Sequence, residues 1–197
     1  DMDIRDDVSG QGTELQKSED FCYRDMRQDF IVHTNLRNDI ELMQFNPSSS
    51  FFGSGEAKIL NVAMTDQDGR LLSWVVGGEM VKLRVEAECY KDMFSPIIGF
   101  NVKDRLGQTL FGDNTCITYM KSPLAVKNGQ KLFAEFEFRM PILYAGDYSI
   151  TVAIAEGTQR EHVQHHWMND AFIFKSHAPG ALCMMGIPMK KIFMEVK

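Results

Sequence analysis

Four of the five histidines lie between residues 162 and 177, where they could act together as metal ligands: His162, His165, His166 and His177. On an extended chain His165 and His166 point to opposite faces, and His162 lies about 13 Å from His166 at roughly 3.3 Å per residue. On a helical turn His162 and His166 would meet, yet no Cys, Asp or Glu completes a clear set of ligands. We therefore predict no metal site and interpret these histidines as exposed or hydrogen-bonded.

Motifs of nucleophilic, zinc-dependent or nucleotide-dependent catalysis are absent from the sequence. It contains no GxSxG, HExxH, GxGxxG or GxxxxGK[ST], so hydrolase, metalloprotease, dinucleotide and ATPase sites lack their characteristic residues. The four cysteines are widely separated and form no CxxC pair, which argues against a zinc ribbon or a thioredoxin-like site. We predict no catalytic residues and no cofactor, and we expect Cys89 to pack in the core.

Residues suited to binding a sugar are more numerous. Carbohydrate sites on β-sandwiches combine aromatic faces for the apolar side of a ring with amides, carboxylates and cations for its hydroxyls. The candidates are side chains that the core pattern leaves unclaimed: Trp74, Arg84, Tyr90, Asn101, Lys103, Asn114, Tyr119, Arg160 and Trp167. Each could instead be an exposed aromatic ring or a solvated charge of the kind found on any sheet.

The elements that position these side chains are short β-rich runs separated by turn signals. Residues 79–90 alternate small or aliphatic residues with charged ones, the pattern of an antiparallel strand with one face in water. Further strands are predicted at 57–64, 96–104, 108–120 (one or two), 131–140, 149–154, 171–174 and 186–197. With almost no helical periodicity, this series predicts an all-β fold, an immunoglobulin-like antiparallel β-sandwich.

Two features of the C-terminal third leave alternatives open. Tyr148 follows a corner at residues 141–147, where an immunoglobulin-like sandwich places its tyrosine corner, but it could equally be one more core residue. The final run alternates Ile192, Met194 and Val196 and is separated from the preceding strand by about ten residues. Such a strand could close its own sheet or be exchanged with a second copy of the chain.

The net charge of −6 is unevenly distributed. Residues 1–50 hold eleven acids and five bases, so residues 51–197 hold sixteen of each. Without a surplus of clustered Lys and Arg we expect no nucleic-acid partner, and without a run of about 18 apolar residues no membrane insertion. Asn, Pro, Ser and Gly over residues 46–55 are typical of a linker. We predict an acidic connector at 1–54, loosely ordered or docked on its neighbour, and a folded domain at 55–197.

Three segments together resemble a known family, the C-terminal carbohydrate-binding domain of Wzt-type proteins. They are residues 55–59, residues 138–154 with Pro141, Leu143, Gly146 and Tyr148, and residues 165–174 with Trp167. Wzt-type proteins are the nucleotide-binding subunits of ABC transporters that export bacterial O-antigen polysaccharide, and the most similar ones serve polymannose O antigens. The resemblance covers residues 55–197 and makes residues 1–54 the tether to an ATPase domain.

The resemblance implies a non-catalytic domain, dimeric through exchange of its last strand, that binds the modified non-reducing end of a finished glycan. Binding would report chain completion to the transporter, whose other partner is its transmembrane subunit. The implied location is the cytoplasm, at the inner face of the bacterial inner membrane. No sugar-contact motif of the family maps onto this sequence residue by residue. The alternative is a structural module that dimerises or docks the parent protein and has no affinity for glycan.

Overall fold

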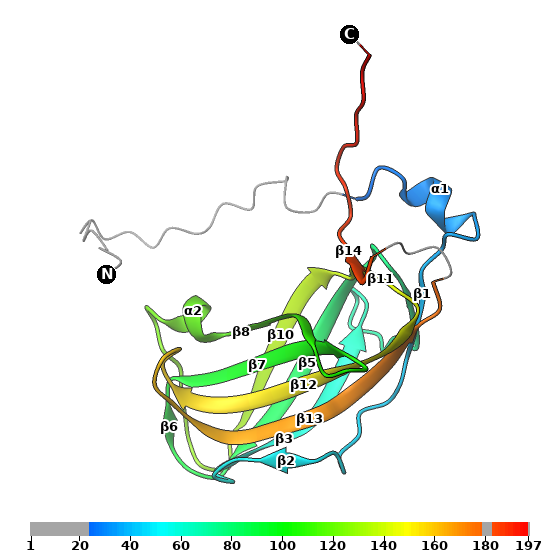
Figure 1. Cartoon of the computed structure of the whole chain (residues 1–197). Helices are drawn as coiled ribbons and strands as arrows, with labels where there is room; N and C mark the ends of the chain where they lie inside the picture. Colours follow the sequence, from blue (N-terminus) through cyan, green and yellow to red (C-terminus); the bar gives the residue numbers. More distant parts are fainter. Residues whose placement is uncertain (1–23, 179–182, 197) are drawn as a thin grey trace, which may run out of the picture.

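Two antiparallel β-sheets face each other in the computed structural model, which describes residues 24–178 and 183–196 (Figure 1). The large sheet has the order β4 (Trp74–Val76), β1 (Asp39–Leu42), β13 (His162–Ser176), β12 (Gly146–Gly157), β7 (Pro96–Asp104) and β8 (Thr109–Asn114), and β2 (Phe51–Phe52) also pairs with β13. The small sheet has the order β10 (Lys131–Arg139), β5 (Met80–Cys89) and β3 (Ala57–Thr65). The predicted all-β, immunoglobulin-like sandwich is confirmed.

Short elements complete the ends of the sandwich. They are the pair β6 (Met93–Phe94) and β9 (Ala125–Val126), the pair β11 (Ile142–Leu143) and β14 (Met185–Gly186), and the helices α1 (Gln28–Val32) and α2 (Cys116–Tyr119). Both helices are too short to span a bilayer, and no helix in the described part of the chain could do so.

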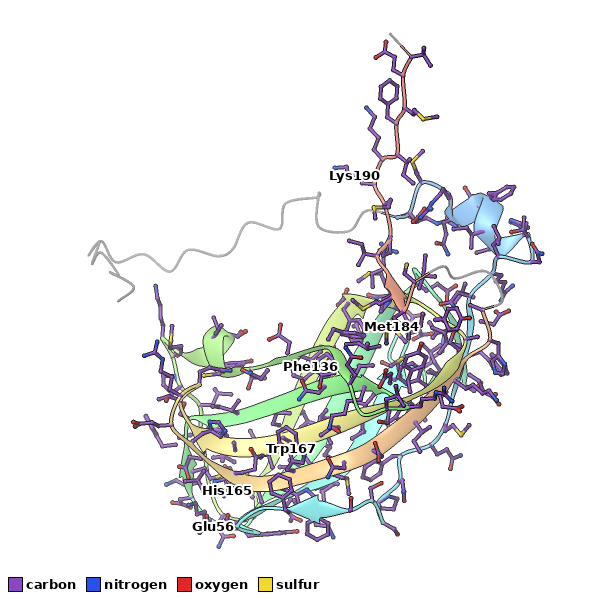
Figure 2. All side chains as sticks on the ribbon, in the orientation of Figure 1. Glu56, Phe136, His165, Trp167, Met184 and Lys190 are labelled. Atoms are coloured by element: carbon purple, nitrogen blue, oxygen red, sulfur yellow. The ribbon has the colours of Figure 1, made fainter. Side chains whose placement is uncertain are left out.

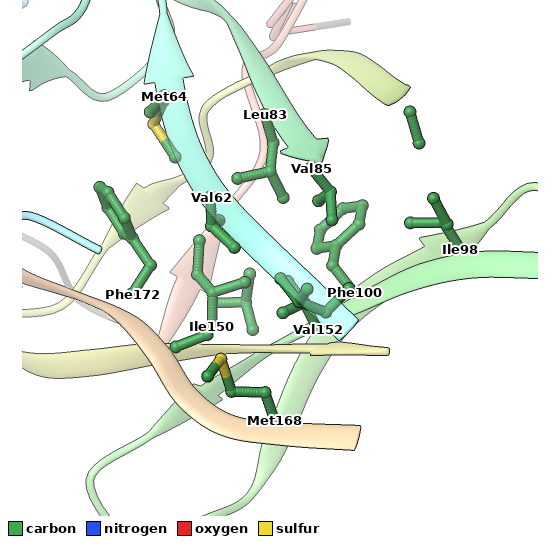
Figure 3. Close-up of a cluster of buried hydrophobic side chains, with 14 of the residues drawn as sticks. Val62, Met64, Leu83, Val85, Ile98, Phe100, Ile150, Val152, Met168 and Phe172 are labelled. Atoms are coloured by element: carbon green, nitrogen blue, oxygen red, sulfur yellow. The ribbon is translucent and has the colours of Figure 1, made fainter. Parts of the chain in front are cut away.

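The core lies between the two sheets and follows from the alternation of the strands. Val81, Leu83, Val85, Ala87 and Cys89 are fully buried on one face of β5, as their period of two predicts. Figure 3 shows side chains of β3 and β5 meeting those of β7, β12 and β13 across this space. The residues that do not enter the core are therefore presented on the outer faces of the sheets.

Two predicted segments differ from the structure. Residues 108–120 form one strand, β8, followed by the single helical turn α2 rather than a second strand. The strand predicted at 171–174 is only part of β13, which begins at His162. Two register irregularities explain the difference, one near His165 and one between Met168 and Phe172, because each interrupts the alternation that marks a strand.

The tyrosine corner is present. The hydroxyl of Tyr148 donates a hydrogen bond of 2.8 Å to the carbonyl of Tyr144, four residues upstream. The Tyr148 ring stacks on Phe174 with a centroid distance of 5.3 Å, and the residue is buried. Tyr148 therefore fills both roles that the sequence left open.

The segment before residue 55 contributes to the sandwich in its described part. β1 pairs with both β4 and β13, and Ile40 and Leu42 on it are buried. Asn38 is fully buried and exchanges hydrogen bonds of 3.0 Å with the backbone of Leu143 in both directions. The sheet thus begins upstream of the boundary predicted between residues 54 and 55, and residues 24–54 are docked on the domain.

The C-terminal segment leaves the sandwich. After β14, residues 187–196 run away from both sheets as an extended arm (Figure 1). The strand predicted over 186–197 does not form within this chain, because in the described residues only its first position pairs, in β14 with β11. The base of the arm is held by the segment before α1, since the Met26 amide donates to the Met189 carbonyl at 2.9 Å and the Met189 amide to the Asp25 carboxylate at 2.8 Å.

Candidate functional site

A groove of about 440 Å³ lies on the outer face of the large sheet, across β13, β12, β7 and β8. Strand register places one row of side chains across it in the order Phe52, Trp167, Ala153, Gly99 and Asn114. Aromatic rings therefore stand at one side, small residues form the floor, and an amide stands at the other side.

The floor is low because glycines interrupt two of the strands. A side chain at Gly99 would place its Cβ 2.9 Å from the Cβ of Asn114, and one at Gly112 would collide with the backbone of Phe100. Ala153 and Ala155 on β12 continue the same shallow surface. Glycine in a strand interior weakens the strand and commonly marks a place where a ligand approaches the backbone.

Polar groups with unused hydrogen-bonding capacity line this floor. The Thr151 hydroxyl is buried without a partner, and the side-chain amide of Asn101, opposite it on β7, makes no hydrogen bond within the described residues. Gln164 donates from its Nε2 to the carbonyls of Ile154 and His166, which leaves its side-chain oxygen available. The hydroxyl of Thr65 on the small sheet is also buried without a partner, so it is the position of Thr151 in the groove that makes it a candidate ligand contact.

Trp167 forms the aromatic wall in a fixed orientation. Its ring stacks on Phe52 with a centroid distance of 5.8 Å, and its indole N–H donates to the Asn169 side-chain oxygen at 3.1 Å. The Lys103 ammonium lies 6.0 Å from the centre of the indole ring. Figure 2 shows Trp167 on the sheet, with His165 and Glu56 at the neighbouring edge. Because these contacts hold the ring before any ligand binds, little side-chain entropy remains to be lost on binding.

One end of the groove is closed. The hairpin between β12 and β13 reaches toward β8, where the Asn114 side chain donates to the Gln159 side-chain oxygen at 3.3 Å. Thr158 and His162 of the same hairpin line the groove, as does the exposed Ile117 of α2. The opposite end leads along β12 and β7 toward Ser149 and Lys103, which face each other in register.

A charged cluster fastens the segment that carries Phe52 to β13. The fully buried His165 has its Nδ1 2.7 Å from the Ser54 hydroxyl and 3.2 Å from the Glu56 carboxylate. Its Nε2 lies 3.5 Å from Glu156, and Lys91 bridges Glu56 and Glu156 at 2.8 and 3.3 Å. Lys91 lowers the pKa of Glu56 below its usual value, with help from Ser54 and His165. Burial alone would raise the pKa of Glu156, but the Phe94 amide and Lys91 lower it overall.

The remaining histidines of the sequence cluster are separated. His166 is buried on the core side of β13, where its Nδ1 accepts the Ile59 amide at 3.3 Å, and burial followed by the charge of Lys58 lowers its pKa. His177 lies 3.1 Å from Glu41 at the far end of the strand. Among residues 24–178 and 183–196, no three His, Cys, Asp or Glu side chains are grouped so that they could hold a metal ion.

The structure brings together four of the nine candidate binding residues. Asn101, Asn114 and Trp167 line the groove, and Lys103 flanks Trp167. Arg160 lies on the exposed hairpin between β12 and β13 but is not among the residues that line the groove.

The other four candidates lie elsewhere. Arg84 is on the outer face of the small sheet, 3.4 Å from Glu135. Tyr90 follows β5, and Tyr119 lies on α2 over a separate cleft between the sheets. Trp74 is on the edge strand β4, with its ring 5.6 Å from that of His177. Alternation on a strand separates the two faces but cannot tell which sheet a face belongs to, so these four were grouped with the others.

Sequence reasoning missed several groove residues. Thr151, Gln159, Gln164 and His162 are polar residues on strands or a hairpin with no distinguishing motif. A signal was available in the glycines of β7 and β8, because a strand that keeps Gly99 or Gly112 gives up packing at that point. Phe52 lay in the predicted connector and could not be placed from sequence.

The chemistry available in the groove is that of recognition. Its one carboxylate, that of Asp113, accepts the backbone amide of Asn114 at 2.7 Å. Amides, a hydroxyl, an imidazole and an indole ring can bind a polyhydroxylated ring through hydrogen bonds and through contact with its apolar face.

Comparisons with known proteins agree with this architecture. A solved structure described as the C-terminal domain of wzt superposes with a TM-score of 0.60 at 20% sequence identity, covering 77% of this chain and 91% of that one. A β-glucosidase involved in saponin metabolism from intestinal bacteria gives a TM-score of only 0.26 at 14% identity, over 63% of this chain and 16% of that one, which is too low to inform the fold. No curated protein matches.

The sequence profile of the Wzt C-terminal domain matches residues 48–187, most of the chain. The profile begins near β2 and ends just after β14, so it includes the small sheet, every strand of the large sheet except β1, and the groove with Trp167. This chain belongs to the Wzt C-terminal domain family.

Proposed function

We propose that this domain binds the modified non-reducing end of an O-antigen polysaccharide in the groove of the large sheet. The observation that carries the proposal is the unused polar lining of the groove, where the side chains of Thr151 and Asn101 make no hydrogen bond within the described residues and the ring of Trp167 is held in place. A sugar ring could place one face on the indole and its hydroxyls on the amides. Wzt C-terminal domains are non-catalytic binding domains, and the family suggests a role in O-antigen transport.

The closed end of the groove favours recognition of a chain end. A polymer that lies across an open sheet can be gripped at any point, whereas a groove that stops at the hairpin of Gln159 accepts a terminus. A modification on the terminal sugar would then contact the protein at the hairpin of Gln159. In this proposal, binding reports that the glycan is complete and licenses its export by the ABC transporter.

The remaining partners follow from the same proposal. Residues 1–54 would connect this domain to an ATPase domain, which acts with the transmembrane transporter subunit at the cytoplasmic face of the inner membrane. The extended arm would add a strand to a second copy, giving a homodimer. Its apolar side chains support this, since Ile192, Phe193, Met194 and Val196 are all more than half exposed, and such surface is usually covered by a partner.

Calorimetric titration of the domain with capped and uncapped fragments of the strain's own O polysaccharide tests the proposal. The capped fragment should bind, and Asn101→Ala should weaken it by about tenfold, since one or two hydrogen bonds of about 1 kcal/mol are lost. Arg84→Ala, on the other sheet, is the matched control and should bind as the unaltered domain does. Equal binding of capped and uncapped fragments would refute recognition of the terminus.

The alternative function is a structural module that only dimerises or docks its parent protein, and the exposed apolar arm is the observation that favours it. It predicts dimers in sedimentation together with no heat of binding for any fragment. Removal of residues 187–197 should abolish the dimer in either case but leave glycan affinity unchanged if the groove binds glycan.

A further inference from the structure

A second depression, of about 490 Å³, lies on the same outer face of the large sheet. It is lined by Lys103, Arg105, Asp147, Ser149, Asn169 and Asp170, among others. Lys103 and Asn169 line this second depression, and each also contacts Trp167, which lines the first groove. The two depressions are therefore successive parts of one surface, separated by the ridge that Trp167 makes.

The polar groups of this second depression are available to a ligand. Within the described residues, Arg105, Asp147 and Asp170 make no side-chain hydrogen bond or ion pair. Asp104 lines the hollow as well, but its carboxylate is occupied by the amides of Leu106 and Gln108 in the turn after β7. Uncommitted carboxylates beside cations suit a neutral ligand rich in hydroxyls, which both accept and donate hydrogen bonds.

The spacing requires an extended ligand. Ala153 in the first groove and Ser149 in the second depression lie on the same strand, about 13 Å apart at roughly 3.3 Å per residue. One sugar ring cannot reach both positions, whereas a linear oligosaccharide along β12 can. We expect the hairpin to set its direction, because a chain whose terminal unit meets Gln159 would continue along β12 past Lys103.

We propose that the second depression is a subsite for the sugar units that follow the terminal one, so that the glycan runs along β12 from the hairpin toward the turn at Arg105. This inference rests on the proposed function and adds to it the length and the direction of the bound glycan. In this proposal the first groove recognises the terminal unit of a finished chain. The units that follow it bind in the second depression and add affinity that a single capped sugar lacks.

Titration of the whole chain with size-fractionated fragments of the strain's O polysaccharide tests the subsite. Oligosaccharides long enough to pass Trp167 should bind at least tenfold more tightly than capped disaccharides. Arg105→Ala and Asp147→Ala should each weaken binding of the long oligosaccharides by about threefold to tenfold, because about 1 kcal/mol of hydrogen bonding is lost. Neither substitution should change the affinity for the disaccharide. Asp68→Ala and Arg70→Ala, an exposed pair in the turn after β3, are matched controls with no expected effect.

A spin label at the reducing end of a short fragment tests the direction. It should broaden the amide resonances of residues 104–108 and spare those of 158–161, and the reverse pattern would overturn the proposed direction. Equal affinity for short and long fragments would overturn the subsite while leaving the proposed function intact. Failure of every fragment to bind would instead refute the proposed function.

Discussion

Thr151→Val should stabilise the domain and weaken its binding of glycan. The hydroxyl of Thr151 is buried without a partner, and the residue is only 1% exposed. An unsatisfied buried group of this kind costs about 1–3 kcal/mol, and valine has the same shape without the hydroxyl. We expect a gain of about 1 kcal/mol in the free energy of unfolding, or roughly 2–4 °C in Tm for a domain of this size.

The loss of affinity has the same origin. Thr151 lines the groove opposite Asn101, and we expect a sugar hydroxyl bound there to bond to the Thr151 hydroxyl. One such hydrogen bond is worth about 0.5–1.5 kcal/mol, so the variant should bind glycan about twofold to tenfold more weakly. Urea unfolding gives the stability of the variant, and calorimetry with the capped fragment gives its affinity.

Thr65→Val is the matched control, because the hydroxyl of Thr65 is also buried without a partner but belongs to the small sheet. It should stabilise the domain by a similar amount and leave glycan affinity unchanged. If Thr151→Val binds glycan as the unaltered domain does, Thr151 is no ligand contact. If it destabilises the domain, the hydroxyl has a partner within the fold and the argument fails.

Three further outcomes follow from the described contacts. Ala153→Leu should reduce glycan affinity at least tenfold with little change in urea unfolding, because the longer side chain fills the groove from its floor; unchanged affinity would place the site elsewhere. Asp25→Asn should release the arm, seen as faster hydrogen exchange at the Met189 amide. The side-chain hydrogen bond from Arg27, and then the Met189 amide, lower the pKa of Asp25 from 3.8 to about 2 against the effect of burial. This shift is worth at most about 2 kcal/mol, because Arg27 is partly exposed and screened. That contribution is complete above pH 4 and is lost as pH falls through about 2. Equal protection of the Met189 amide in the variant and the unaltered chain at pH 7 would contradict the role of Asp25. His166→Gln should flatten the fall in unfolding free energy below pH 6.5, because burial and Lys58 lower the pKa of His166 and the unfolded chain binds the proton more readily; equal slopes for the two proteins would argue against it.

The strands could be predicted wherever both faces of a sheet have a uniform environment. Along β5 every second residue enters the core and its neighbours meet water, so the period of two is unbroken. Along β13 the irregularities near His165 and Asp170 shift the pattern. Asp170 has a left-handed φ of 46°, which Asp tolerates better than most residues but which its presence in a sequence does not predict. Local sequence therefore predicted strand β5 in full and strand β13 only over 171–174.

The candidate site could be predicted only in part, for a related reason. Asn101 and Trp167 were found because they stand out on the polar face of a strand, but Arg84 and Trp74 stand out in the same way. Asn101 and Trp167 line the same groove because β7 pairs with β12 and β12 pairs with β13. The alternation within a single strand does not predict which distant strand it pairs with. Phe52 is an example, since only the two-residue strand β2 brings it beside Trp167, and β2 lies in a segment whose composition is that of a linker.

The fastening of residues 51–56 to the edge of β13 limits how freely this domain can be recombined. Phe52 stacks on Trp167, which forms the wall of the groove, and it lies in the segment that joins β1 of the large sheet to β3 of the small sheet. Ser54 and Glu56 bind His165 of β13, so the segment and the strand are matched to each other. A chimera that takes the groove of one relative must also take its residues 51–56. If only β7, β12 and β13 were transferred, the new β13 would face residues 51–56 of the recipient, which are not matched to it.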